Sequence, residues 1–165
     1  MANCFGPQVE LLLLPDEVFE SAVATETPQG IAALVRLREH TLESALDAQD
    51  ALIVAAAGVQ DPGNLGTIIR SLEAFGGNAL LHGEGTVSYV NPKAVRASAG
   101  SVFRLPIVHV DLKRTIPELR RRGIRCIGTS SHRGQPAHEL DLTGPVALFI
   151  GNEGAGLPEV TRPTF

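Results

Sequence analysis

Residues 146–157 constrain the fold more than any other stretch of this chain. The first five are all apolar, which is the length and composition of a strand buried on both faces of a parallel sheet. Gly151, Gly154 and Gly156 follow, and a glycine can adopt positive φ and let a ligand approach its backbone closely because it carries no Cβ. Open α/β sheets bind ligands at the carboxyl ends of their strands. The stretch therefore predicts a ligand-binding loop with one ionisable group, Glu153, at its centre.

A tight turn without a ligand is the alternative interpretation of this loop. The glycine spacing does not fit the dinucleotide-binding pattern G-x-G-x-x-G, and no Lys-Ser or Lys-Thr pair follows the glycines as in a Walker phosphate loop. The glycine pattern by itself therefore does not distinguish a tight turn from a ligand-binding loop.

A second polar loop, residues 61–66, comes shortly after another continuous apolar run at 51–57. Its Asp-Pro-Gly-Asn sequence is typical of a turn, and residues 67–75 then have the apolar spacing of a helix. Asn64 is placed to cap this helix. Arg70 would lie between one and two turns further on, within reach of a pocket above the strand end. A purely structural cap and a solvated arginine are the alternative roles of these two residues.

Strand and helix patterns alternate along nearly the whole chain, which predicts an α/β fold with a mostly parallel sheet. Polar or glycine-rich turns follow Ala57, Gly128 and Ile150, and these turns would converge on one crevice if their strands are neighbours. The expected strands are residues 9–14, 31–37, 51–57, 78–82, 103–110, 124–128 and 146–150, and the expected helices are residues 15–23, 41–48, 67–75, 91–98 and 111–122.

The composition is that of a globular protein, and 165 residues are enough for one domain with a proper core. No apolar run approaches the roughly 20 residues needed to cross a bilayer, so we expect no membrane partner and a cytoplasmic location. Cys4 and Cys126 lie far apart in the sequence, and the five histidines have no ligand-like spacing, so we expect no metal site.

The net charge of −4 disfavours broad electrostatic capture of a nucleic acid. A local exception is the arginine cluster formed by Arg120, Arg121, Arg122 and Arg125. Two interpretations of the cluster stay open. The cations suit the carboxyl end of a helix that Gly123 terminates, or they form a face that contacts phosphates.

Four segments together resemble one family, the SpoU/TrmH-type RNA ribose 2′-O-methyltransferases. The stretch Asp-Pro-Gly-Asn-Leu-Gly-Thr-Ile-Ile-Arg at 61–70 resembles the first family motif, and Phe-Ile-Gly-Asn-Glu-Gly-Ala-Gly-Leu at 149–157 resembles the second. Residues 93–101 are also family-like. Residues 25–31 resemble the junction before the catalytic domain in two-domain members. Two ordered motifs at a suitable separation are far more specific than either glycine cluster alone.

The resemblance implies a Rossmann-like sheet with helices on both faces, a C-terminal trefoil knot and a homodimer. It also implies S-adenosylmethionine as cofactor and a structured RNA, ribosomal or transfer, as substrate. By position, Arg70 matches the arginine proposed to activate the ribose hydroxyl, Asn64 an asparagine on the substrate side, and Glu153 the acidic residue of the second motif. The residues expected to contact the cofactor, largely through backbone, are Thr129, Ile150, Gly151, Asn152, Gly154 and Leu157.

The role of Arg70 can be narrowed by its chemistry. An arginine is normally protonated, with a pKa above about 12, and is therefore a poor general base. We favour a role in which Arg70 orients the ribose hydroxyl and a flanking phosphate and stabilises charge.

The chain departs from the family pattern because the third motif, which supplies half of the cofactor pocket, is absent from it. Residues 1–30 are interpreted as the remnant of an N-terminal RNA-binding domain with its linker, and residues 31–165 as a catalytic domain shortened at its C-terminal end. The alternatives are a remnant that binds RNA without catalysis and a nucleotide-binding α/β module. Binding of S-adenosylhomocysteine separates an enzyme of this family from the latter.

Overall fold

The computed structural model describes residues 9–23, 25, 27–130, 134–159 and 161. The chain divides into two units, Met1–Arg36 and Leu37–Phe165. In the first unit the helix α1 (Asp16–Ala22) begins directly after Pro15, with two acidic residues in its first turn, as the sequence predicts. The predicted strands at 9–14 and 31–37 are wrong, since neither range contains a strand. Their apolar side chains are mostly exposed, and an isolated extended segment has no neighbour to share its backbone hydrogen bonds.

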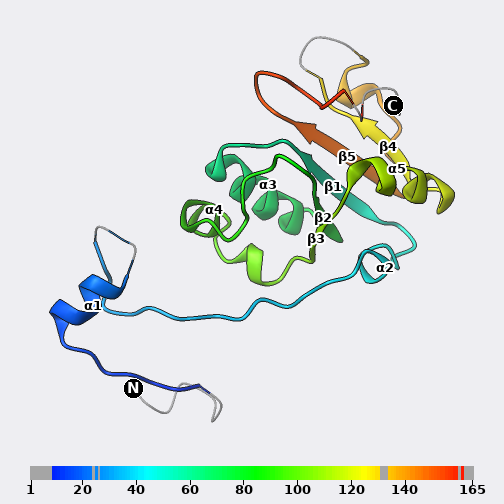
Figure 1. Ribbon diagram of the computed structural model, residues 1–165. Coiled ribbons are helices and arrows are strands. Elements are labelled where there is room, and N and C mark those ends of the chain that lie inside the picture. Colours follow the sequence, from blue (N-terminus) through cyan, green and yellow to red (C-terminus); the bar gives the residue numbers. More distant parts are fainter. Residues whose placement is uncertain (1–8, 24, 26, 131–133, 160, 162–165) are drawn as a thin grey trace. The chain divides into compact units, whose positions relative to one another are not determined.

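The second unit is built on a five-stranded parallel sheet in the order β3-β2-β1-β5-β4 (Figure 1). This confirms the predicted fold class. The knot implied by the family resemblance stays a prediction. The strands are β1 (Leu52–Ala57), β2 (Ala79–His82), β3 (Ile107–His109), β4 (Arg125–Gly128) and β5 (Val146–Gly151).

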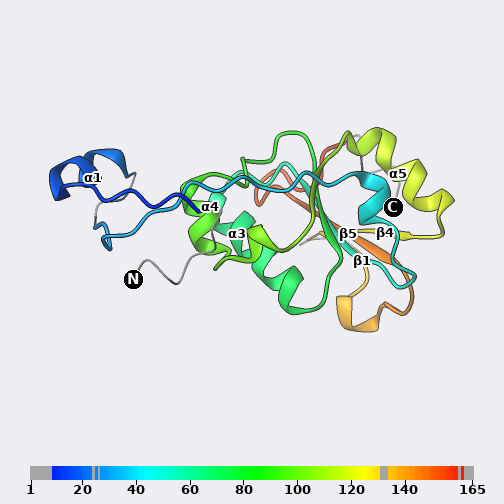
Figure 2. The same cartoon turned by 90° about the horizontal axis from the view of Figure 1, so that it is seen from below.

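Helices cover both faces of the sheet, as the resemblance implies (Figure 2). Among the described residues of this unit, the remaining elements are α2 (Leu42–Ala45), α3 (Pro62–Ala74), α4 (Pro92–Ala97), α5 (Leu112–Arg121) and two short 3₁₀ helices, η2 (Ser101–Phe103) and η3 (Ala137–Glu139).

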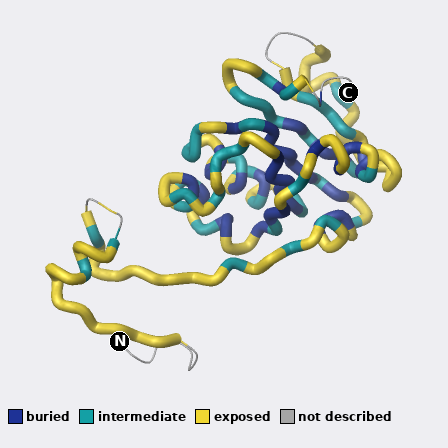
Figure 3. The backbone as a smooth tube through the Cα atoms, viewed as in Figure 1, coloured by how far each residue is buried: buried dark blue, intermediate teal, exposed yellow. Residues whose placement is uncertain are grey.

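Two hydrophobic cores lie on the two faces, because successive side chains of a strand point in opposite directions. Ile53 and Phe149 pack with α2 and α5 on one face. Val54 and Leu80 pack with α3 and η2 on the other face. Figure 3 shows the buried residues concentrated along the strands. All six residues of β1 except Leu52 are buried, as expected for the central strand of a covered sheet.

The start of α3 differs from the prediction that Asn64 caps it. The helix begins at Pro62, and the cap is Asp61, whose Oδ1 accepts the Asn64 backbone N–H at 2.8 Å. Pro62 suits the first helical position because its missing N–H has no partner there in any case. Asn64 therefore lies within the first turn of α3, and its side chain is available for another contact.

Glycine at position 66 allows α3 and α4 to pack closely. A Cβ there would lie 2.4 Å from the Ala94 carbonyl oxygen and 2.6 Å from the Ala97 Cβ. The small side chain of Ala97 in α4 also permits this close approach. This packing holds α3 against α4. It thereby also fixes the position of the polar loop at residues 61–66, where α3 begins.

Within the described part of the chain, no helix is long and apolar enough to cross a membrane. The same residues contain no group of three or more His, Cys, Asp or Glu side chains placed to hold a metal ion.

Candidate functional site

The loops expected to form the site lie side by side at one edge of the sheet. β1 is hydrogen-bonded to β5, and β5 to β4, and all three strands run in the same direction. The turns after Ala57, Gly128 and Ile150 therefore meet at the carboxyl edge of neighbouring strands, which confirms the condition on which their convergence depended.

The loop after β5 closes on itself. Asn152 and Gly156 exchange two backbone hydrogen bonds, of 2.9 and 2.8 Å. The Asn152 Oδ1 accepts the N–H groups of Gly154 and Ala155, both at 2.9 Å, and its Nδ2 donates to the Gly58 carbonyl at 3.4 Å. Asn152 thus shapes its own loop and ties it to the end of β1.

The structure requires glycine at two of the three glycine positions in this loop, for different reasons. A Cβ on Gly151 would lie 2.3 Å from the Gly156 carbonyl oxygen, so Gly151 makes room for the returning loop. Gly156 has a φ of +69°, in the left-handed region that favours glycine. Gly154 has neither constraint, because its added Cβ would meet only Asn152 Oδ1, at 3.6 Å.

One side-chain contact joins the two motifs that the sequence singles out. The Nδ2 of Asn64, in α3, donates to the Glu153 Oε1 in the loop after β5, across 89 positions of sequence. A carboxylate from one loop and an amide from the other are thereby brought together at the carboxyl edge of the sheet. Both side chains lie on the surface, where a ligand can reach them.

An ion pair at the start of α3 involves the residue that holds the backbone of Asn64. The Oδ2 of Asp61 accepts from the Lys93 Nζ at 2.9 Å, and its Oδ1 holds the backbone of Asn64. The hydrogen bond from Lys93 and that from the Asn64 backbone lower the pKa of Asp61. Neither Asp61 nor Lys93 is among the site residues predicted from the sequence. Asp-Pro at a helix start is a capping signal that could have identified Asp61, whereas nothing local in the sequence indicates that Lys93 is its partner.

Arg70 lies apart from the contact between Asn64 and Glu153. It is six residues beyond Asn64 on α3, about 9 Å further along the helix axis. Its residue is exposed, and its side chain forms no hydrogen bond or ion pair with the other residues that the structure describes. Its guanidinium is therefore not engaged by these residues of its own chain.

The other expected cofactor residues use their side chains to hold the fold. The Thr129 hydroxyl donates to the Phe149 carbonyl at 2.9 Å. Ile150 packs partly buried on the face that α3 covers, and Leu157 is buried in the core on the opposite face. Contact between these residues and a cofactor would therefore have to be made largely by their backbone.

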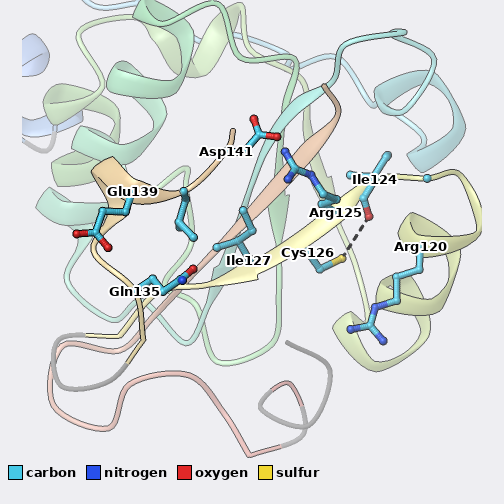
Figure 4. A pocket seen from close by; sticks show the side chains of 10 residues that line it. Arg120, Ile124, Arg125, Cys126, Ile127, Gln135, Glu139 and Asp141 are labelled. Atoms are coloured by element: carbon cyan, nitrogen blue, oxygen red, sulfur yellow. Dashed lines mark hydrogen bonds between the residues drawn. The ribbon is translucent and has the colours of Figure 1, made fainter. Parts of the chain in front are cut away.

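A separate open depression of about 670 Å³ lies against β4, between the end of α5 and residues 135–141 (Figure 4). None of the expected site residues lines it. Within it, Arg125 donates to the Thr143 carbonyl at 2.6 Å, and burial raises the pKa of the Cys126 thiol. Cys126 is thus a half-buried packing residue beside the depression.

Two of the four arginines in the cluster beside this depression share one carboxylate at the end of α5. Arg121 and Arg122 both pair with Glu118, at 2.8 and 2.7 Å. The two guanidinium groups lower the pKa of Glu118 to about 2. These ion pairs favour the interpretation of the cluster as a solvated helix end over that of a phosphate-binding face.

An open parallel sheet whose polar loops meet at the carboxyl edge defines an α/β ligand-binding domain. The SpoU rRNA Methylase family matches residues 51–163, and the chain belongs to this family. Both motif loops and the contact between Asn64 and Glu153 lie within the matched range.

Relatives and solved structures agree with this membership. The 23S rRNA (guanosine(2553)-2′-O)-methyltransferase RlmP of Bacillus subtilis is 38% identical over 90% of this chain and 58% of its own length. The SpoU methyltransferase AviRb from Streptomyces viridochromogenes, solved in complex with the cofactor AdoMet, is 35% identical, with a TM-score of 0.68 over 74% of this chain and 49% of that one.

A putative RNA methyltransferase of the TrmH family from Porphyromonas gingivalis is 28% identical, with a TM-score of 0.73 over 92% of this chain and 61% of that one. This chain thus spans roughly half to three-fifths of the length of these proteins.

Proposed function

We propose that this protein acts in S-adenosylmethionine-dependent methylation of a ribose 2′-hydroxyl in a structured RNA. The observation that carries the proposal is the contact between Asn64 and Glu153, which unites the first and second family motifs at the carboxyl edge of β1 and β5. The activity of the RlmP relative supports ribosomal RNA as the substrate, and we propose the cytoplasm as the place of reaction.

The loop after β5 fits a cofactor held by backbone. The side chain of Asn152 sets the shape of the loop through its hydrogen bonds to the backbone. The fold does not require a glycine at position 154, but the missing Cβ leaves space there for a ligand to approach the backbone. S-Adenosylmethionine, when bound, supplies a methyl group on a sulfonium leaving group. The residues proposed to hold it are Thr129, Ile150, Gly151, Asn152, Gly154 and Leu157.

The residues of the chain have to align the ribose and stabilise the negative charge that develops on its 2′-oxygen. Arg70 is free of the intramolecular contacts described above, and its planar fork can hold a phosphate or the ribose oxygen in place while negative charge develops on that oxygen. The hydrogen bond between Asn64 and Glu153 holds the two motif loops together. Alignment of this kind lowers the barrier because the reacting groups no longer have to find each other by diffusion.

A calorimetric titration with S-adenosylhomocysteine tests the cofactor site. A dissociation constant near micromolar, about −8 kcal/mol, is expected if the loop after β5 forms a specific pocket. RNA binding without any heat from S-adenosylhomocysteine would contradict the proposal and would indicate a non-catalytic RNA-binding module.

Substitution of Arg70 tests the catalytic assignment. Arg70→Ala should abolish methyl transfer to RNA and leave S-adenosylhomocysteine affinity unchanged, and Arg70→Lys should retain activity only if charge alone is sufficient. Arg114→Ala, at an exposed arginine of α5, is the matched control. Full activity of Arg70→Ala would overturn the assignment.

We also propose that the protein forms a homodimer and that residues 1–30 belong to a separate RNA-binding part. The boundary between the two units at Arg36 and Leu37 supports a separate N-terminal part. Light scattering of the purified protein would measure the oligomeric state, and a monomer at micromolar concentration would contradict a dimer.

A further inference from the structure

An aromatic cluster lies at the carboxyl ends of β2 and β3, outside the site described above. His82 and His109 are paired in register as the last residues of the two strands, and their rings meet edge to face with centroids 4.5 Å apart. The Tyr89 ring lies 5.7 Å from His82 and 5.4 Å from His109. The three rings therefore touch one another although they come from two strands and the loop between them.

One ring of the cluster is buried and held in place, and another is exposed to solvent. His82 is buried, and its Nε2 lies 2.9 Å from the Val87 carbonyl oxygen. Burial is the main cause that lowers the pKa of His82, so this ring is held as a neutral packing group. Tyr89 is half-buried, and His109 is exposed. The ring of His109 is thus presented to solvent on a rigid support.

The cluster lies on the same face of the sheet as α3, the helix that carries Asn64 and Arg70. His82 shares the side-chain direction of Leu80, and His109 that of Ile107, both of which belong to the core packed under α3. The end of β3 is two strands away from the end of β1, about 10 Å at the usual strand spacing. That separation is short enough for one RNA strand to reach both places.

A cation and a further exposed ring border the cluster. Arg38, Tyr89 and Phe103 line one shallow depression. Arg38 is exposed and forms no ion pair with the residues that the structure describes, and Phe103 has 51% of its surface exposed. Aromatic faces beside an unpaired arginine are the combination with which proteins bind single-stranded RNA.

We propose that His109 and Tyr89 form a stacking platform for an unpaired nucleotide of RNA, with Arg38 at a neighbouring phosphate. The inference rests on the proposed function only in taking this RNA to be the substrate. The platform holds bases that flank the ribose placed at Arg70. Its stacking is sequence-tolerant, because every base has a π-face.

The composition of the chain supplies a specific probe. Tyr89 is the only tyrosine, and the chain has no tryptophan, so the intrinsic fluorescence of the protein reports on this cluster. Titration with an eight-nucleotide single-stranded oligoadenylate should quench this emission, after correction for absorption by the RNA. The same oligonucleotide with a fluorescent label gives the dissociation constant by anisotropy.

Variants separate stacking from other causes. His109→Ala should weaken oligoadenylate binding about five- to thirty-fold. His109→Phe and Tyr89→Phe should retain binding because they keep the ring. His138→Ala, at an exposed histidine of η3, is the matched control and should bind like the unaltered protein. A blunt-ended RNA duplex, which has no unpaired bases, should bind all variants alike.

Two outcomes would overturn the platform: absence of tyrosine quenching by oligoadenylate, or equal affinity of His109→Ala and His138→Ala. A parallel titration with S-adenosylhomocysteine keeps the two proposals apart. If quenching persists without S-adenosylhomocysteine binding, the platform stands and the methyltransferase proposal fails. If S-adenosylhomocysteine binds and His109→Ala has no effect on RNA affinity, the platform alone is wrong.

Discussion

Gly151 and Gly154 differ by three positions in sequence, yet the structure requires glycine only at the first. A Cβ at 151 would lie within 2.5 Å of three backbone atoms of Gly156 and Leu157, and neither strand nor loop can yield without losing the bridge between Asn152 and Gly156. A Cβ at 154 makes only an ordinary contact. The two positions therefore allow the shape of the loop and its contact with a ligand to be tested separately.

Gly151→Ala should destabilise the protein by about 1–3 kcal/mol, because the overpacked loop has to move. It should also weaken S-adenosylhomocysteine binding at least tenfold. Gly154→Ala should leave stability within about 0.5 kcal/mol of the unaltered chain and lower affinity only if the ligand lies against that residue. Urea unfolding and calorimetry measure the two effects. A Gly151→Ala variant as stable as the parent would contradict this account of the loop.

Among the elements, α5 carries an unusual residue for a helix interior. Pro117 is exposed at the sixth position of the helix, where it cannot donate the usual backbone hydrogen bond. The helix persists because Leu112, Ile116 and Leu119 are buried against the sheet, which shows tertiary packing prevailing over local propensity.

Pro117→Ala should therefore raise the free energy of unfolding by about 1–3 kcal/mol, since it restores a helix donor and removes a steric conflict. The greater freedom of alanine in the unfolded chain offsets part of this gain. Thermal unfolding followed by circular dichroism gives the shift. A lower melting temperature for the variant would mean that the proline serves a local geometry that alanine cannot provide.

The ion pairs of Glu118 at the end of the same helix give α5 a pH dependence. The folded-state pKa of Glu118 is about 2, below its ordinary value of 4.5, because Arg121 and Arg122 donate to the carboxylate. Its contribution to stability is complete above pH 4.5 and is lost as the pH falls toward 2. The effect should be small, because these ion pairs lie at the surface and the Arg121 side chain is 72% exposed.

Glu118→Gln should be slightly less stable than the unaltered chain at pH 6 and equally stable near pH 2. Urea midpoints at several pH values between these limits measure the difference. Glu73, whose pKa Arg104 also lowers to about 2, adds a slope of the same sign in both proteins and does not affect the comparison. A difference that does not change with pH would contradict this assignment.

For the whole molecule, charge limits how RNA can be held. The chain has a net charge of −4, and two of the four arginines of the cluster, Arg121 and Arg122, are already paired with Glu118. We therefore expect RNA to bind mainly on the face of the sheet that α3 covers, through exposed cations such as Arg38 and Arg70 and through base stacking.

Replacing Arg120, Arg121 and Arg122 together by Ser should then change RNA affinity less than about threefold at physiological salt, whereas Arg38→Ser together with Arg70→Ser should lower it and reduce its salt dependence. Anisotropy titrations at two or more salt concentrations distinguish the two variants. A large loss of affinity in the triple variant would restore the phosphate-binding interpretation of the cluster.

Much of the second unit could be predicted because its signals are local. Short apolar runs predict β1, β2 and β5, and amphipathic spacing predicts α5, all close to their observed bounds, whereas α3 begins five residues before its predicted start. The runs at 9–14 and 31–37 carry similar apolar signals, and the predictions of strands there are wrong because a strand exists only where another strand accepts its hydrogen bonds. A local pattern contains no information about that partner.

The sequence by itself determined the parallel α/β class, the two motif loops, and the chemistry available in them, because these depend on residue type and short-range spacing. Only the tertiary structure decided which strands are neighbours, and hence that Asn64 contacts Glu153, that Lys93 holds Asp61, and that Gly151 is needed by the loop itself. Each of these contacts joins residues through the packed backbone of the sheet and its helices. Their side chains meet only after the order of the strands has placed those elements side by side.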